Sequence, residues 1–399
     1  MSYNFDQIIP RTDTDCIKWD FYGHGGQPVE WNGCENNQTL PLWVADMDFP
    51  SPQPVIDALT ERARHGFFGY TGLTQEYYQT VIHWMKKRHG WEVEQDWIVN
   101  TPGVVTALFQ LVQTFVKPGE KVIVQPPVYH PFYYAIEENG AVIARNPLIY
   151  KNGQYEMDFD DLALKAADPD VKMLILCHPH NPIGRVWRPD ELRRLGQICL
   201  ENGVLVVSDE IHGDLIHAGH SFTPYARLSA DLAQNAIVCT APSKTFNLPG
   251  LKMSNIIIPH AGLREAFQKT LTRGGIYGAN AFGVVAVKAA YRAGEDWLGQ
   301  VLAYIQANYQ FLTDYLRENI PQIFAVPLEG TYLAWLDCRA LGMEDKALMN
   351  LLLEKAKVYL DEGTIFGPEG AGFLRVNIAC PRAILAEALA RMKEVLSAV

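Results

Sequence analysis

Lys244 has the residue type and the setting for covalent chemistry with a carbonyl compound. It lies in the segment 241–247, directly after the apolar run 236–239, which has the composition of a buried strand. An amine at the end of a buried strand is poorly solvated, and poor solvation favours the neutral, nucleophilic form of lysine. A lysine that forms a Schiff base needs that form. A single lysine in a loop is more often a solvated surface residue. The neighbouring groups must therefore show whether Lys244 is a Schiff-base lysine.

Polar side chains also follow three other apolar runs of strand length. Tyr129 comes after residues 121–124, Asn181 after residues 171–177, and Asp209 and His212 after residues 204–207. Ligands of open α/β sheets bind beyond the carboxyl ends of the strands. We therefore expect these side chains to lie together with Lys244 at one edge of a sheet.

A fifth group is a glycine turn that leads into a helix. Residues 100–103 end in Pro-Gly, and the apolar positions that follow predict a helix through residue 115. The free N–H groups at a helix N-terminus, here those of Gly103, Val104 and Val105, can bind a phosphate. The signal is weak when taken alone, because many helices begin after Pro-Gly.

Together these groups meet the requirements of pyridoxal 5′-phosphate. This cofactor needs a lysine for its aldehyde, a carboxylate for its pyridinium nitrogen, a phosphate cradle and a platform for its ring. Lys244, Asp209, the Gly103 turn and Tyr129 supply one of each, and Asn181 is a candidate donor to the phenolic oxygen. Each residue also has an ordinary alternative, as a helix cap, a core aromatic or a turn residue. Because all of these residues occur in the order that the cofactor site requires, a cofactor site is favoured over these separate structural roles.

The elements that position these groups predict an α/β fold. Helical patterns alternate with runs that are apolar on both faces, as in a mostly parallel mixed sheet covered by helices. We predict an N-terminal arm, residues 1–50, that joins a small domain, a large cofactor-binding domain, residues 51–290, and a small α+β domain, residues 291–399. Within the small domain the predicted helices span residues 297–318, 345–359 and 381–399, and a predicted strand spans residues 332–336.

Composition excludes several other classes of protein. The 399 residues are 48% hydrophobic, and a net charge of −11 disfavours nucleic acid or an anionic membrane as the main partner. No apolar stretch approaches about 20 residues, the length of a membrane span. The N-terminus has no pattern of a signal peptide, and the seven cysteines lack Cys-x-x-Cys spacing, so we expect a cytoplasmic protein.

Two other kinds of site are disfavoured by their spacing. His212, His217 and His220 do not follow His-Glu-x-x-His, so we expect no metal. The glycines of residues 23–26 do not form Gly-x-Gly-x-x-Gly between a strand and a helix, which argues against a nicotinamide dehydrogenase.

Several longer motifs carry a family resemblance. The segments 181–184 (Asn-Pro-Ile-Gly), 208–210 (Ser-Asp-Glu), 243–244 (Ser-Lys) and 373–377 (Phe-Leu-Arg-Val-Asn) resemble the signatures of pyridoxal-phosphate enzymes with the aspartate-aminotransferase fold, called fold type I. The motifs at residues 18–20, 43–49, 69–72, 208–212 and 241–247 are similar to those of the cystathionine β-lyase-like carbon–sulfur lyases of the cystalysin kind. The resemblance covers nearly the whole chain.

The resemblance implies roles for further residues. Arg375 matches the arginine that holds the substrate carboxylate, and a guanidinium suits that task because its fork binds both oxygens. Tyr70 matches a tyrosine that reaches the cofactor phosphate of the neighbouring subunit, which implies a homodimer with a shared active site. Ser243 and Lys252 match cofactor-binding positions, although Lys252 stands where many relatives have an arginine. The segment 43–48, with Trp43, Ala45 and Asp46, and the segment 274–277 are candidates for lining the substrate pocket.

The sequence departs from relatives at two further positions near the cofactor. His212 lies where aspartate aminotransferase has a tyrosine that faces the cofactor oxygen, and His130 replaces a second tyrosine of cystalysin. His212 cannot repeat the hydrogen bond of the tyrosine hydroxyl to the cofactor oxygen in the same form. His130 has no hydroxyl group that could shuttle a proton as the second tyrosine of cystalysin would.

These parts imply a lyase reaction on a sulfur-containing amino acid. Lys244 would anchor the cofactor and then remove the α-proton as general base, after which a thiol leaves the β-carbon and pyruvate and ammonia are released. Two alternatives remain open. An aminotransferase shares the first steps, and a non-catalytic regulatory protein could retain the fold to bind a partner.

Overall fold

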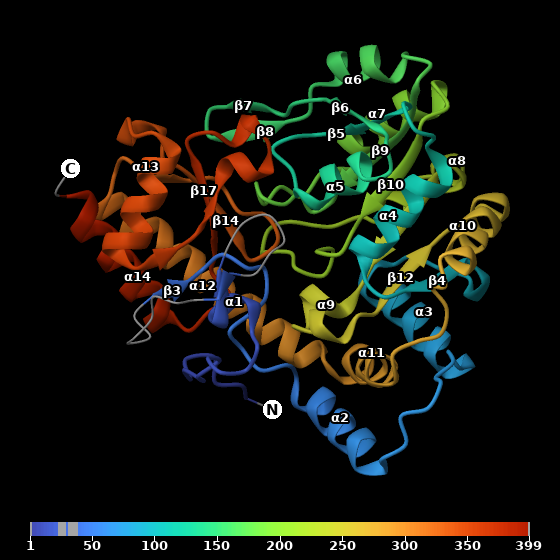
Figure 1. Ribbon diagram of the computed structural model, residues 1–399, viewed down its shortest axis with the longest axis horizontal. Coiled ribbons are helices and arrows are strands. Elements are labelled where there is room, and N and C mark those ends of the chain that lie inside the picture. Colours follow the sequence, from blue (N-terminus) through green and yellow to red (C-terminus); the bar gives the residue numbers. More distant parts are fainter. Residues whose placement is uncertain (1, 23–28, 31–38, 398–399) are drawn as a thin grey trace.

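The computed structural model describes residues 2–22, 29–30 and 39–397. Its centre is a seven-stranded mixed sheet, which crosses the right half of Figure 1. β12 pairs antiparallel with both of its neighbours, whereas the other four strand pairs of the sheet are parallel. The predicted α/β class with a mostly parallel sheet is therefore confirmed. In spatial order the strands are β4 (Ile98–Thr101), β12 (Ser254–Ile257), β11 (Ala236–Thr240), β10 (Leu205–Asp209), β9 (Val171–Cys177), β5 (Lys121–Val124) and β6 (Val142–Arg145).

Helices cover both faces of this sheet because its strands are apolar on both faces. In β9, Met173 and Ile175 pack into one buried cluster, and Leu174 and Leu176 pack into another on the opposite face. The first cluster includes α4 (Val104–Phe115), α5 (Pro131–Glu137) and α10 (Ala261–Arg273). The second includes α6 (Phe159–Ala166), α7 (Pro189–Glu201) and α8 (Ala230–Gln234).

A smaller sheet lies among the orange and red C-terminal elements of Figure 1. Its order is β13 (Phe324–Ala325), β14 (Leu333–Asp337), β17 (Phe373–Asn377) and β16 (Asp361–Glu362), and all three pairs are antiparallel. The long helix α12 (Glu295–Asn319) packs against α14 (Arg382–Leu396) beside it. The division of the chain at residues 50 and 290 stays a prediction.

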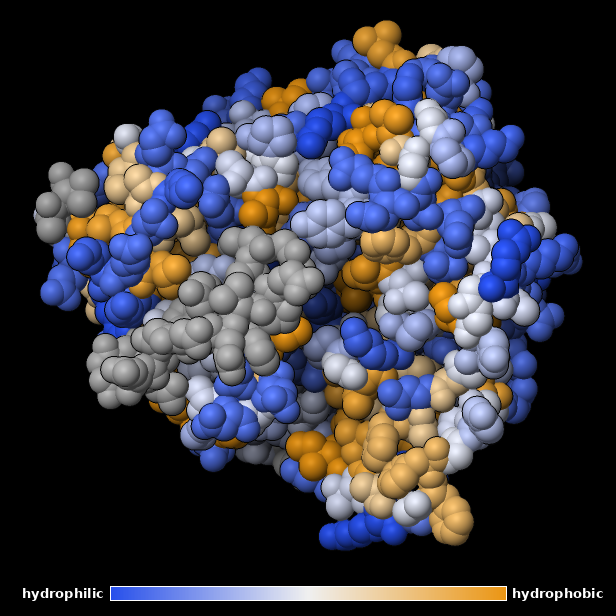
Figure 2. Space-filling model, in the orientation of Figure 1, coloured by the Kyte–Doolittle hydropathy of each residue, from blue (hydrophilic) through white to orange (hydrophobic). Residues whose placement is uncertain are grey.

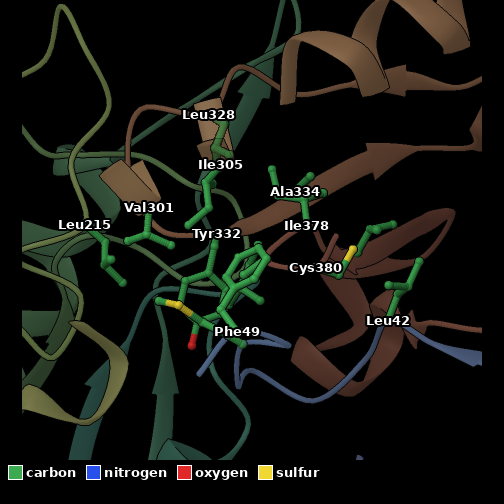
Figure 3. Close-up of a cluster of buried hydrophobic side chains, with 14 of the residues drawn as sticks. Leu42, Phe49, Leu215, Val301, Ile305, Leu328, Tyr332, Ala334, Ile378 and Cys380 are labelled. Atoms are coloured by element: carbon green, nitrogen blue, oxygen red, sulfur yellow. The ribbon is translucent and has the colours of Figure 1, made fainter. Parts of the chain in front are cut away.

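The N-terminal segment joins these C-terminal elements through a short strand pair and a shared core. β3 (Leu40–Pro41) pairs in parallel with β15 (Val358–Tyr359). Figure 3 shows Leu42 and Phe49 of this segment in one buried cluster with side chains from α12 and β14, among them Val301 and Ala334. The cluster is buried, so the segment that follows β3 is fixed by the burial of apolar surface.

Three further helices pack against one another and contribute to the same buried cluster. They are α2 (Gln53–His65), α3 (Gln75–His89) and α11 (Ala281–Ala293), with α11 in contact with both others. Shorter elements are α1 (Ile17–Asp20), α9 (Pro242–Thr245), α13 (Asp345–Asn350) and several one-turn 3₁₀ helices. Two antiparallel strand pairs, β1 (Phe21–Tyr22) with β2 (Val29–Glu30) and β7 (Ile149–Lys151) with β8 (Gln154–Glu156), lie outside the two larger sheets.

Three local predictions were wrong. The helix predicted over residues 345–359 ends at Asn350, continues as a wider π-helical turn to residue 356, and gives way to β15 because that segment pairs with β3. Asp209 is the last residue of β10 and does not follow the strand. Lys244 lies in the one-turn helix α9, which begins at Pro242, and not in the polar turn that is expected directly after the apolar run 236–239.

Two observations bear on the membrane span and the metal site that the sequence argues against. No helix among the described residues is long and apolar enough to span a membrane. Within the same residues, no group of three His, Cys, Asp or Glu side chains is arranged to hold a metal ion. The glycines of residues 23–26 fall outside the described residues.

Candidate active site

A cavity of about 310 Å³ lies at the carboxyl ends of the central strands. Eleven of the sequence-predicted residues line it, and they come from the end of β10 and from loops or helices that follow β3, β4, β5, β9, β10 and β11. This convergence follows from the parallel sheet, because the carboxyl ends of its strands meet at one edge. The predicted residues in the lining are Ala45, Gly103, Val104, Val105, Tyr129, Asn181, Asp209, His212, Ser243 with Lys244, and Lys252.

Lys244 presents its amine to this cavity. The Nζ atom donates a hydrogen bond to the main-chain carbonyl of Ala45 at 2.7 Å. Burial lowers the pKa of Lys244 to about 8, while the neighbouring charges of Asp46 and Asp209 act in the opposite direction. A larger fraction of this amine is therefore neutral near neutral pH than of a solvated lysine amine, and the neutral form is the one that a nucleophile or a base requires.

Asp209 presents a carboxyl group to the same cavity from the end of β10. It is only 4% exposed, and its Oδ1 atom accepts a hydrogen bond from the main-chain N–H of Ile211 at 3.1 Å. Burial raises the pKa of Asp209 to about 7, although the charge of Lys244 partly opposes this. A carboxylate in such a setting is stabilised by a ligand that brings a positive charge or an N–H donor.

The N-terminus of α4 forms one edge of the cavity. Apolar residues at positions 104, 107, 108, 111 and 112 bury one face of this helix, which fixes its direction. Gly103 precedes it with φ 111°, a conformation that favours glycine, and no side chain caps the first turn. Ser243 and the exposed Lys252 line the same cavity and add a hydroxyl group and a positive charge. Together these donors suit a phosphate.

The buried side chains of His212 and Asn181 and the half-buried ring of Tyr129 complete the walls of the cavity. Burial lowers the pKa of His212 well below its usual value and raises the pKa of Tyr129 to about 12, so both are neutral. The amide oxygen of Asn181 accepts a hydrogen bond from Arg375 at 3.0 Å. This contact orients the amide so that its NH₂ group is left to donate elsewhere.

Arg375 is not in the cavity lining but lies directly behind it. It is 4% exposed on β17, opposite Asp361 of β16, and the two form a buried ion pair. Its Nη2 atom also donates to the carbonyl of Trp43 at 3.0 Å, and its guanidinium lies 4.7 Å from the centre of the Phe366 ring. Its Nε atom is buried and has no hydrogen-bond partner among the described residues.

The N-terminal segment meets the cavity mainly through its backbone. The carboxylate of Asp46 is engaged by Arg11, at 3.1 Å and 2.8 Å, and Lys18 lies 3.8 Å away. The Trp43 ring packs against the Tyr359 ring at 5.0 Å. The predicted substrate-binding residues Trp43 and Asp46 are therefore close to the site, but these side-chain contacts are with the protein itself.

Tyr70 lies outside the cavity of its own chain. Its side chain is fully exposed in a second hollow of about 1090 Å³, which shares Pro102, Lys252 and Met253 with the cavity. Most of the predicted 274–277 segment lines this second hollow as well.

Several residues near the site were not predicted. Tyr332 donates from its hydroxyl to the Ala45 carbonyl at 2.8 Å, and Cys177, Ile211 and Met253 line the cavity. Cys177 and Ile211 adjoin the predicted strand ends, so proximity in sequence could have indicated them. Tyr332 comes from a distant element and left no such signal.

Comparison with known protein families identifies the class. The chain matches the model of the aminotransferase class I and II family over residues 38–392, and it belongs to that family. This agrees with the mixed sheet and with the cavity at its carboxyl edge, and it confirms the predicted fold class.

Individual relatives are similar to the chain over their full length. It is 47% identical to cystathionine beta-lyase PatB of Bacillus subtilis, covering 99% of this chain and 100% of the relative. The crystal structure of cystalysin from Treponema denticola, which contains a pyridoxal 5′-phosphate cofactor, has a TM-score of 0.94 and 40% identity over 100% of both chains. The structure of a pyridoxal-phosphate-bound C–S lyase from Staphylococcus hominis has a TM-score of 0.89 and 35% identity over 99% of both chains.

Proposed function

We propose that this protein is a pyridoxal-phosphate-dependent carbon–sulfur β-lyase. It converts cysteine-type amino acids to pyruvate, ammonia and a thiol. The observation that carries the proposal is the pairing of a buried lysine amine with a buried carboxyl group in one cavity, beside an uncapped helix N-terminus. The similarity to lyases over the whole chain supports loss of sulfur as the outcome.

The residues of the cavity fit the cofactor. Asp209 would hold the protonated ring nitrogen, which explains a buried carboxyl group that no basic side chain binds directly among the described residues. The N–H groups of Val104 and Val105, with Ser243 and Lys252, would hold the phosphate. The N–H of Gly103, which the sequence also offered as a donor, is already bonded to the Thr101 carbonyl at 2.8 Å. Tyr129 would contact the ring face, and Asn181 would donate to the phenolic oxygen. When bound, the cofactor withdraws electrons from the substrate's α-carbon.

Lys244 would act twice, first as the anchor of the cofactor and then as the base that removes the α-proton. Its amine is poorly solvated, which favours the neutral form that both tasks need. The Ala45 carbonyl lies 2.7 Å from Nζ and holds the amine at the cavity wall.

Arg375 would bind the α-carboxylate of the substrate. Asp361, Asn181 and the Trp43 carbonyl fix its guanidinium, so little side-chain freedom remains to be lost on binding. The unpartnered Nε–H is a donor that a carboxylate could satisfy. His212 would remain a neutral neighbour of the site.

A homodimer would complete the active site. Figure 2 shows apolar side chains gathered at the lower edge of the molecule, over α2 and the segment after it. Phe67 and Phe68 of that segment are 74% and 59% exposed, and they stand close in sequence to Tyr70. Burial of this face against a second copy would remove apolar surface from water and carry Tyr70 to the partner's phosphate site.

The six cysteines of the described ranges are free thiols, which suits a reducing compartment. We propose a cytoplasmic location, and these free thiols support it.

The experiment must separate a lyase from an aminotransferase. Purified protein is incubated with L-cystathionine in the absence of any keto acid, and pyruvate is assayed. A lyase forms pyruvate under these conditions, because it needs no amino-group acceptor. Absence of pyruvate, together with amino-group exchange when keto acids are added, would establish the aminotransferase instead. A colourless protein that does not respond to added cofactor would favour a non-catalytic binding role.

A further inference from the structure

The segment 44–49 has no regular secondary structure, and side chains hold its carbonyl groups in place. Asn377 donates from Nδ2 to the carbonyls of Val44 and Asp46, at 2.7 Å and 2.6 Å. Asn247 holds two more carbonyls further along the segment, at 2.9 Å each. The direction of each of these carbonyls is therefore set by a buried or half-buried amide from another element.

The Ala45 carbonyl lies between the two that Asn377 binds, and it accepts two hydrogen bonds of its own. One comes from Nζ of Lys244 at 2.7 Å and the other from the hydroxyl of Tyr332 at 2.8 Å. A carbonyl oxygen has two lone pairs, so these two donors occupy both of them.

We propose that the Ala45 carbonyl receives the Lys244 amine whenever that amine is not bonded to the cofactor, and that Tyr332 is a positioning residue that shares this acceptor. The inference rests on the proposed function, because it assumes that Lys244 anchors the cofactor. By taking one lone pair, Tyr332 weakens the hold of the carbonyl on a protonated amine. The amine is thus kept in place but remains free to leave.

Two observations support the role of Tyr332. Its side chain is 1% exposed, and burial raises the pKa of its phenol well above the usual value, so the hydroxyl remains a donor. It comes from the segment just before β14, whereas Lys244 follows β11, so the shared acceptor joins elements of the two sheets.

Removal of the Tyr332 hydroxyl leaves the other charged and titratable groups around the Lys244 amine in place. Asp46 and Asp209 favour the protonated amine, and Arg375 disfavours it. The remaining titratable or charged groups of the cavity lining are His212, Tyr129 and Cys177, which burial keeps neutral, and the cationic Lys252.

The test removes the Tyr332 hydroxyl and follows the reactivity of Lys244. Tyr332→Phe is compared with wild type and with Tyr309→Phe, a matched control whose hydroxyl donates to the Val326 carbonyl at 2.9 Å away from the cavity lining. Each protein is stripped of cofactor and treated with an amine-reactive reagent over a range of pH, and modification of the Lys244 peptide is measured by mass spectrometry. Stopped-flow absorbance then gives the rate at which pyridoxal 5′-phosphate is captured.

In Tyr332→Phe both lone pairs of the Ala45 carbonyl oxygen are available to the protonated amine of Lys244. We expect the pH midpoint of Lys244 modification to rise by about 0.5 to 1, the effect of about one hydrogen bond, and cofactor capture near pH 7.5 to slow about threefold to eightfold. Tyr309→Phe should match wild type in both measurements. If Tyr332→Phe does not fold, Tyr332→Met tests the same hydroxyl.

An unchanged midpoint and capture rate in the Tyr332 variant would overturn this inference alone. The proposed function has a separate readout in the same samples, because borohydride reduction should fix the cofactor on Lys244 of the wild-type protein. Failure of that attachment would contradict the proposed function itself.

Discussion

Arg375 donates a hydrogen bond from Nη1 to the amide oxygen of Asn181 at 3.0 Å, across 194 positions of sequence. The contact joins β17 of the smaller sheet to the turn that follows β9 of the central sheet. In the proposed mechanism Arg375 binds the substrate carboxylate and Asn181 binds the cofactor ring. The orientation of the substrate is thereby linked to that of the cofactor.

Substitution of Arg375 by lysine tests this linkage. Lysine keeps the charge but loses the fork that faces Asn181, Trp43 and Asp361, so substrate binding should weaken. We expect kcat/KM for L-cystathionine to fall about 100-fold or more, mostly through KM, because a charge-assisted bidentate contact contributes about 3 kcal/mol. Steady-state kinetics measures the change. The exposed Arg317→Lys is the control, and a KM within twofold of wild type in Arg375→Lys would exclude the assigned role.

The raised pKa of Asp209 predicts a pH-dependent stability of the cofactor-free protein. The folded carboxyl titrates at about 7, whereas an unfolded aspartate titrates near 3.9. The folded state therefore binds this proton more tightly, and its stability falls as pH rises from about 4 to 7. Between pH 5 and 7 the loss should be about 2 kcal/mol. Urea unfolding of Asp209→Asn should show a correspondingly flatter profile.

Glu210 also contributes to the pH dependence of stability, so a Glu210 variant must be measured alongside the Asp209 variant. Burial raises its pKa to about 8, so it contributes with the same sign. Glu210→Gln should therefore flatten the profile over an overlapping range, from about pH 4 to about pH 8. Wild-type and Asp209→Asn profiles that run parallel from pH 5 to 7 would show that Asp209 is ionised in the folded apoprotein.

Gly103 should be required for phosphate binding beyond its effect on stability. An alanine at φ 111° is strained, and it shifts the N–H groups at the start of α4. We expect Gly103→Ala to raise the dissociation constant of pyridoxal 5′-phosphate at least about tenfold. Gly119→Ala is a matched control, because that glycine has φ 87° with open space around it and does not line the cavity. Similar cofactor affinities for the two variants would argue against a phosphate at this helix.

A shared active site predicts that two inactive variants complement each other. Lys244→Ala and Tyr70→Phe disable different halves of the site if Tyr70 serves the partner subunit. In a mixed dimer one site receives both substitutions and the other receives neither. Subunits mixed, unfolded and refolded together should recover about a quarter of wild-type activity. Lys244→Ala subunits mixed with Arg375→Ala subunits are the control, because those residues belong to the same chain's site and should recover none.

The central part of the site could be predicted because it obeys a rule of sheet topology. Lys244, Asp209, Asn181 and Tyr129 each stand at or just after the carboxyl end of a strand, and adjacent parallel strands bring such positions together. The apolar runs that mark those strands are visible in the sequence. No knowledge of long-range contacts was needed.

The outer part could not be predicted in the same way. Tyr332 and Asn377 act on irregular backbone about 290 or 330 positions away, through single hydrogen bonds that impose no periodic pattern. The helix predicted beyond Asn350 failed for a related reason. Pairing of β15 with β3 overrides the local helical pattern, and that pairing depends on a strand more than 300 residues earlier.

The most direct test of the account follows both products of carbon–sulfur cleavage by wild type and by Lys244→Ala. Each protein is supplied with pyridoxal 5′-phosphate and L-cystathionine but no keto acid, and pyruvate and free thiol are measured in the same samples over time. We predict equal molar amounts of pyruvate and thiol with wild type, and neither product above background with Lys244→Ala. Wild-type protein that forms no pyruvate, or a Lys244→Ala variant that forms it at the wild-type rate, would contradict the account.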